Sequence, residues 1–426
     1  MPALVGLLVV ALLLAPGSPV TAQDEEAEQT LGDLETQETA SMREATYKEL
    51  AKAQEAAEAD NYAQAIQILD KLGKEDLNDY ERAQQLNLYA FIYYSQDQIG
   101  KAVNAYEQLL AQPNLPEALT TSTLYTLAQL YFSQEQWQKS IGALQRWLSL
   151  TPEPSRQAYE MMAQAYYQQE KYREALEPAR QVVELTKRAG EPVKEHSLLL
   201  LRVLYYELKE YPRVVDVLEQ LIRSYPKKQY WMQLASLYGE MENQDKQLNV
   251  LELAYLQGYL TDETEVLSLV SLLLNKEIYL RAGKVLDKAL ADGTISSNFE
   301  HWRLLAQAWT MAQENERAIP ALTRAAELAP DGKIDVILAQ TYMNMDRWEE
   351  SVAAARNALR KGGLSRPDQA QVMLGQALFE LDRFDEAREA FTAAQADRRS
   401  RQLAAQWLAY IDNEQDRQAQ LAAALE

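Results

Sequence analysis

Apolar residues recur along most of this chain with helical spacing, in a short sequence motif, or phrase, that repeats about every 36 residues. The phrase opens with an aromatic or apolar residue, continues with two polar residues and reaches a mostly small residue at its fourth position. Apolar positions three or four residues apart predict a helix with one buried face. The fourth position falls at Ala65, Ala102, Ser140, Ala175, Val214, Gln247, Ala282, Ala318, Ser351 and Ala387.

A second pattern precedes the phrase and predicts a partner helix. A small residue is followed three positions later by a large ring, which places both on one face of a helix. The two helices would form a hairpin whose apolar face stays uncovered until the next hairpin stacks on it. The pairs are Ala90 with Tyr93, Ala128 with Tyr131, Ala163 with Tyr166, Ala235 with Tyr238, Ala306 with Trp309, and Ala339 with Tyr342.

These residues resemble the tetratricopeptide-repeat (TPR) family, whose repeat is about 34 residues long. The resemblance implies an all-α fold, a right-handed α-solenoid of about ten hairpins over residues 43–402. Trp407 and Tyr410 predict a C-terminal capping helix with a polar tail within residues 403–426. Because the matching residues are packing residues, they indicate a fold and leave the function open. One repeat carries the whole pattern at Trp302, Leu305, Ala306, Trp309, Ala318, Leu322, Ala325 and Pro330.

The first 42 residues differ from the rest. An unbroken apolar run, Ala3 to Ala15, is too short for a bilayer span, which takes about 20 residues, and is typical of a signal peptide. Small residues ending at Ala22 predict cleavage after Ala22, so residues 1–22 form the signal peptide and the mature protein is exported to the periplasm. Residues 23–42 carry seven acids and no base, and we interpret them as an acidic disordered leader.

The net charge and the absence of catalytic motifs narrow the range of possible functions. The formal charge of −21 excludes an overall nucleic-acid footprint and favours a basic protein partner, although solubility alone also explains it. No cysteine is present, and the two histidines, His196 and His301, lie too many repeats apart to share a metal. Since no hydrolase, nucleotide-binding or zinc-protease motif occurs either, we expect a non-enzymatic scaffold without cofactors.

Four rings follow directly after the ring positions of successive first helices. In the TPR family this position faces the concave groove, so the resemblance implies a partner-binding row at Tyr94, Phe132, Tyr167 and Tyr206, with Phe91 and Tyr125 nearby. Rings make good anchors for a peptide, although packing between adjacent first helices is the competing explanation. Arg398, Arg399 and Arg401 form a basic cluster near the C-terminus and are the candidate for a second contact.

A narrower resemblance rests on Tyr225 to Trp231, Ala254 to Tyr259, and Gln406 to Tyr410. These phrases are similar to exported TPR proteins of Gram-negative bacteria that are encoded beside TonB–ExbB–ExbD energy-transduction systems. The resemblance implies a periplasmic accessory protein for TonB-dependent uptake, with a Pro/Lys-rich TonB segment as partner. The alternative is a scaffold for envelope assembly, such as outer-membrane biogenesis, secretion or polysaccharide export. The oligomeric state stays open.

Overall fold

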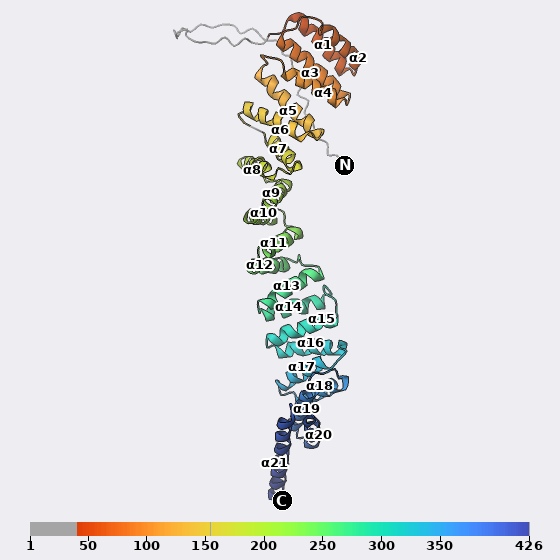
Figure 1. The fold of residues 1–426 in the computed structure, drawn as a ribbon, viewed down its shortest axis with the longest axis vertical. Helices are drawn as coiled ribbons and strands as arrows, with labels where there is room; N and C mark the ends of the chain where they lie inside the picture. Colours follow the sequence, from red (N-terminus) through yellow and green to blue (C-terminus); the bar gives the residue numbers. More distant parts are fainter. Residues whose placement is uncertain (1–40, 154, 426) are drawn as a thin grey trace, which may run out of the picture. The chain divides into compact units, whose positions relative to one another are not determined.

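The computed structural model describes residues 41–153 and 155–425, and every regular element in these ranges is a helix (Figure 1). The chain divides into two compact units, residues 41–130 and 131–425 of the described part, with the boundary inside α5. The predicted signal peptide lies outside the described residues, as does the acidic leader apart from Ser41 and Met42. No helix in the described ranges is both long and apolar enough to cross a membrane.

Within the described ranges, twenty helices follow one another as ten pairs, and one longer helix comes after them. The all-α solenoid of about ten hairpins expected from the sequence is confirmed. The first ten helices are α1 (Glu44–Glu58), α2 (Tyr62–Leu72), α3 (Asp79–Ser95), α4 (Ile99–Leu110), α5 (Glu117–Ser133), α6 (Trp137–Leu150), α7 (Arg156–Gln168), α8 (Tyr172–Arg188), α9 (Glu195–Glu207) and α10 (Tyr211–Ser224). The others are α11 (Lys228–Glu240), α12 (Gln244–Leu256), α13 (Glu263–Asn275), α14 (Tyr279–Ala291), α15 (Phe299–Met311), α16 (Asn315–Leu328), α17 (Lys333–Met343), α18 (Trp348–Lys361), α19 (Pro367–Glu380), α20 (Phe384–Gln395) and α21 (Arg401–Leu425).

The smaller unit is tied together at its start by a buried carboxylate. Glu81 has no exposed surface, and it accepts hydrogen bonds from the backbone N–H and the guanidinium Nε of Arg43, each at 2.9 Å. Asn78 and Glu81 also form a capping box at the start of α3, in which each side chain accepts from the other residue's backbone N–H. The Arg43 guanidinium lowers the pKa of Glu81 to about 2. One carboxylate thus fixes the beginning of α1 against α3.

Within the larger unit, a continuous cluster of buried residues extends from Ala163 to Ile411. Small residues of the repeat pattern, such as Ala175, Ala282 and Ala387, have no exposed surface, as close helix approach requires. Rings fill the space opposite them, and Trp309 is only 1% exposed. Successive hairpins of this unit therefore share their apolar faces, as a stacked repeat array must.

The hairpin turns have a common backbone conformation. One residue in each of the ten turns adopts a left-handed conformation, with φ between 54° and 59°. None of the ten is glycine and eight are acidic, so most turns place a negative side chain at the same edge of the hairpin. The residues are Asp60, Asp97, Glu135, Glu170, Lys209, Glu242, Glu277, Gln313, Asp346 and Asp382.

The last hairpin is covered by α21. Trp407 stacks on Phe391 of α20, with ring centroids 5.4 Å apart and planes 4° from parallel. Ala404 and Ile411 have no exposed surface, and they continue the core onto this helix. The first three turns of α21 thus close the open apolar face of the array.

Candidate functional site

In the larger unit, the rings of the predicted row contact rings across the turn of their own hairpin. The pairs are Phe132 with Trp137, Tyr167 with Tyr172, and Tyr206 with Tyr211, with ring centroids 5.0, 6.0 and 5.9 Å apart. Phe132 and Tyr167 are half-buried, whereas Tyr206 keeps 42% of its surface exposed. The row is therefore partly committed to packing, and Tyr206 is its most accessible member among these three.

Tyr206, the exposed member of this row, is hydrogen-bonded to a carboxylate of the next hairpin. The Tyr206 hydroxyl donates to both oxygens of Glu240, at 3.4 and 3.3 Å, and the Tyr211 hydroxyl donates to Glu240 Oε1 at 3.2 Å. Glu240 is the last residue of α11 and is exposed. Two tyrosines from one hairpin thus hold a carboxylate of the following one.

Two further carboxylates lie beside these rings. Glu170 and Glu207 raise the pKa of Tyr172, where burial makes the largest contribution. Glu240 raises the pKa of Tyr206 by its charge, and Glu207 adds to the effect. We name Tyr167, Tyr172, Tyr206, Tyr211, Glu170, Glu207 and Glu240 the tyrosine–glutamate cluster. Negative charge therefore lies beside both Tyr172 and Tyr206.

The remaining predicted rings belong to the smaller unit. Phe91 is half-buried and packs beside the N-terminal core formed by α1 and α2. Tyr94 is half-buried and contributes to raising the pKa of Tyr106 on α4 to about 12, an effect due mainly to burial. Tyr125 of α5 is also half-buried. None of the three is exposed in the way that Tyr206 is.

The predicted basic cluster is used largely within the chain. Arg399 pairs with Asp397 at 2.7 Å and lies 3.5 Å from the buried Asp368, while Arg401 donates to the Gln395 carbonyl at 3.2 Å. Arg398 is exposed and has no hydrogen bond or ion pair to any described residue. All three arginines are exposed, and Arg398 is the one of them without a partner among the described residues.

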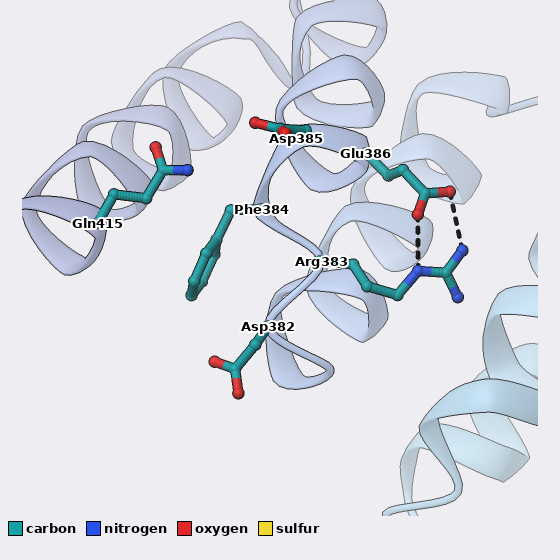
Figure 2. Close-up of a pocket in the computed structure, with 6 residues that line it drawn as sticks. All are labelled: Asp382, Arg383, Phe384, Asp385, Glu386 and Gln415. Carbon is teal, nitrogen blue, oxygen red and sulfur yellow. Dashed lines mark hydrogen bonds and ion pairs between the residues drawn. The ribbon is translucent and has the colours of Figure 1, made fainter. Parts of the chain in front are cut away.

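A shallow cavity lies between the start of α20 and α21. It holds about 220 Å³ and is lined by Asp382 to Glu386 and by Gln415; Figure 2 shows the Phe384 ring among these lining residues. Arg383 is turned aside to Glu386, with Nε 2.7 Å from Oε1. Sites for cofactors and substrates usually enclose about 300–1,000 Å³ with mostly apolar walls. This cavity is smaller and polar, and no group of metal-ligating side chains occurs in the described ranges.

Sequence reasoning missed Tyr172 and Tyr211 as site residues, together with Glu170, Glu207 and Glu240. The sequence did contain a signal for the two tyrosines: in three consecutive hairpins, a second ring stands five residues after the first. That spacing does not place two side chains on one helix face, so helical periodicity does not connect them. A turn with a left-handed residue brings them together instead.

Two family models match the chain. The model described as tetratricopeptide repeat matches residues 267–333 and 338–410, and that of anaphase-promoting complex, cyclosome, subunit 3 matches residues 95–182. These matches show that the chain contains tetratricopeptide repeats. The resemblance drawn from its packing residues is confirmed at this level. TPR arrays generally mediate protein–protein interactions and are typically not enzymes.

Solved structures similar to this TPR chain share little sequence with it. A TPR protein from Parabacteroides merdae is 16% identical, with 70% of this chain and 99% of that one covered, at a TM-score of 0.34. Naa15/Naa10 bound to HypK-THB gives 13% identity, coverages of 82% and 58%, and a TM-score of 0.43. YrrB, a TPR protein with an unusual peptide-binding site, is 16% identical, with 45% of this chain and 97% of that one covered, at a TM-score of 0.33. No curated protein sequence matches the chain.

Proposed function

We propose that this protein is a non-enzymatic scaffold that binds a basic segment of a partner protein. The observation that carries the proposal is the exposed ring of Tyr206 held beside Glu240, within a chain of net charge −21. An exposed ring offers contact area at low entropic cost, and nearby carboxylates favour lysine or arginine on the partner. Phe132 and Tyr167 extend the same edge over the two preceding hairpins.

We further propose that the mature protein acts in the periplasm as an accessory component of a TonB-dependent uptake system. The support comes from the sequence: the signal-peptide pattern ending at Ala22 and the phrases that resemble TPR proteins encoded beside TonB–ExbB–ExbD. A Pro/Lys-rich segment such as that of periplasmic TonB has the charge that an acidic, ring-bearing edge favours. Arg398 is the proposed second contact.

Export and partner binding require separate tests. Cell fractionation and N-terminal sequencing of the mature chain test export, and a protein beginning at Gln23 in the periplasmic fraction is expected. For the partner, the chain from Gln23 onward is titrated with a purified periplasmic TonB fragment at low and moderate salt. We expect binding that weakens with salt, because exposed charges are screened within about 10 Å at 0.1 M.

Two variants identify the surface. The quadruple variant Tyr94/Phe132/Tyr167/Tyr206→Ala is expected to lose binding. The control Leu253→Ala/Leu256→Ala removes two side chains of α12 that are 50% and 75% exposed, and it is expected to bind normally. Circular dichroism shows whether each variant stays folded. No binding by the unaltered protein at micromolar concentrations would reject TonB as the direct partner and favour an envelope-assembly scaffold.

A further inference from the structure

Three carboxylates of the tyrosine–glutamate cluster stand where a helix disfavours negative charge. Glu207 and Glu240 are the last residues of α9 and α11, and Glu170 lies in the turn just after α7. The C-terminus of a helix carries about half a negative charge from its unpaired carbonyl groups, so a cation is favoured there. None of the three carboxylates forms an ion pair with a described residue, although all are exposed.

The rings beside these carboxylates also lack a cation. Elsewhere the chain places one over the ring of a first helix: Lys246 lies 5.4 Å from the centroid of Tyr238, and Arg317 lies 4.9 Å from that of Trp309. In the α9–α10 hairpin the corresponding cation is Arg213, whose guanidinium lies 3.5 Å from Asp216, and the corresponding ring is Tyr205, one residue before Tyr206. No cation of the described residues lies over the ring of Tyr206 or of Tyr211, so these two rings and the carboxylate that they share have no positive partner within the described part of the chain.

The geometry points to a docking site for a lysine or arginine side chain of the partner protein, formed by Tyr206, Tyr211 and Glu240. Glu207 and Glu170 of the cluster extend its negative field. This inference rests on the proposed function and specifies the contact. Two tyrosine hydroxyls hold the Glu240 carboxylate in place before any partner arrives, which lowers the ordering cost of binding. The exposed Tyr206 ring supplies a face for cation–π contact.

The chemistry favours an organic cation over a metal ion. The described ranges contain no group of three side chains placed to hold a metal, and hard cations such as Ca²⁺ take six to eight oxygen ligands. An ammonium or guanidinium group needs fewer carboxylate contacts and gains from an aromatic face. Because the three carboxylates end three consecutive first helices, a partner segment with several spaced cations would contact more than one of them.

The test uses the chain from Gln23 onward and a fluorescent peptide of about twelve residues with alternating proline and lysine, which is extended at about 3.1 Å per residue. A peptide with glutamine in place of lysine is the ligand control. Fluorescence anisotropy at two salt concentrations measures affinity. Glu240→Gln removes the central charge, and Tyr206→Leu removes the exposed ring. Both side chains are exposed, so the fold should persist, and circular dichroism confirms it.

The matched control is Glu277→Gln. Glu277 is an exposed carboxylate in the turn after α13 without an ion pair to a described residue, and the ring-to-ring contact of the α9–α10 hairpin is replaced there by Leu274 and Tyr279. Both glutamine variants change the net charge equally. We expect Glu240→Gln and Tyr206→Leu to weaken lysine-peptide binding about tenfold at moderate salt, and Glu277→Gln to change it less than about twofold.

The outcomes separate this site from the proposed function. Equal losses from Glu240→Gln and Glu277→Gln would show that only net charge matters and would overturn the docking site. A TonB fragment that binds but ignores Glu240→Gln would leave the scaffold proposal standing and reject this contact. Lysine-peptide binding that depends on Glu240 while the TonB fragment does not bind would support the site and reject TonB as partner. An unaltered protein that does not bind the lysine peptide would reject the site.

Discussion

Gly283 of α14 is a position where one added methyl group should separate two helices. A Cβ there would lie 2.8–2.9 Å from three atoms of the Trp309 ring on α15. Trp309 is 1% exposed, and Arg317 covers its face at 4.9 Å from the centroid, so the ring has no free space to enter. Overpacking of this kind costs about 1–3 kcal/mol.

An opposing gain must be subtracted. Alanine is favoured over glycine inside a helix by about 1 kcal/mol, because glycine loses more backbone freedom on folding. Gly283→Ala should therefore destabilise the array by up to about 2 kcal/mol. Gly142 of α6 provides the control, since a Cβ there would meet nothing within 4 Å. Gly142→Ala should keep the helix gain and stabilise by about 0.5–1 kcal/mol.

Guanidinium denaturation, followed by tryptophan fluorescence and circular dichroism, measures both effects. Repeat arrays do not always unfold in one step, so the comparison uses the midpoint of the transition that each probe reports. The midpoint should fall for Gly283→Ala and rise for Gly142→Ala. If Gly283→Ala raised the midpoint as much as Gly142→Ala, the close contact between Gly283 and Trp309 would be wrong.

Three further predictions concern charges and turns. The pKa of Glu81 is lowered to about 2 from 4.5, so its stabilisation is complete above about pH 4.5 and is lost as pH falls towards 2; Glu81→Gln should flatten the pH dependence of the urea midpoint in that range. Lys209 has φ of 58°, so Lys209→Gly should stabilise by about 0.5–1 kcal/mol in thermal unfolding, and Lys209→Val should destabilise. Asp368 is 4% exposed and accepts from Ser400 Oγ at 2.6 Å, so Asp368→Asn should cost about 2–3 kcal/mol and release α21, seen as a change in Trp407 fluorescence.

The fold was predictable because each repeat gives the same evidence again. A small residue such as Ala306 and a ring such as Trp309 carry little information alone, but the return of such pairs along the chain, within a repeat of about 36 residues, favours one architecture. The role of Arg399 was not predictable in the same way. Its partners, Asp397 and the buried Asp368, lie two and thirty-one residues before it, and only folding shows that α19 and the turn before α21 meet there.

The candidate site was predictable in part. Tyr206 was identified because, in the TPR family that the sequence resembles, the place after the ring position faces the groove. Its contact with Tyr211 depends on the turn conformation at Lys209, and its contact with Glu240 depends on how consecutive hairpins stack. Neither follows from residue type. Local pattern therefore indicates which rings can be accessible, and the stacking decides which carboxylates accompany them.

The acidic residues in the hairpin turns raise the question whether folding energetics alone explain their charge. Aspartate is a frequent non-glycine residue in the left-handed region, but glutamate is not, and four turns carry glutamate there: Glu135, Glu170, Glu242 and Glu277. Each follows the C-terminus of a first helix, where the dipole favours a cation by about 0.3–1 kcal/mol. Lys209 is the residue that local energetics would place in such a turn. Backbone preference and helix dipole both oppose these glutamates, so the local energetics of the turn do not explain them. Among the four, Glu170 lies in the tyrosine–glutamate cluster, where the cationic partner that we propose would favour it, whereas Glu277 lies outside that cluster.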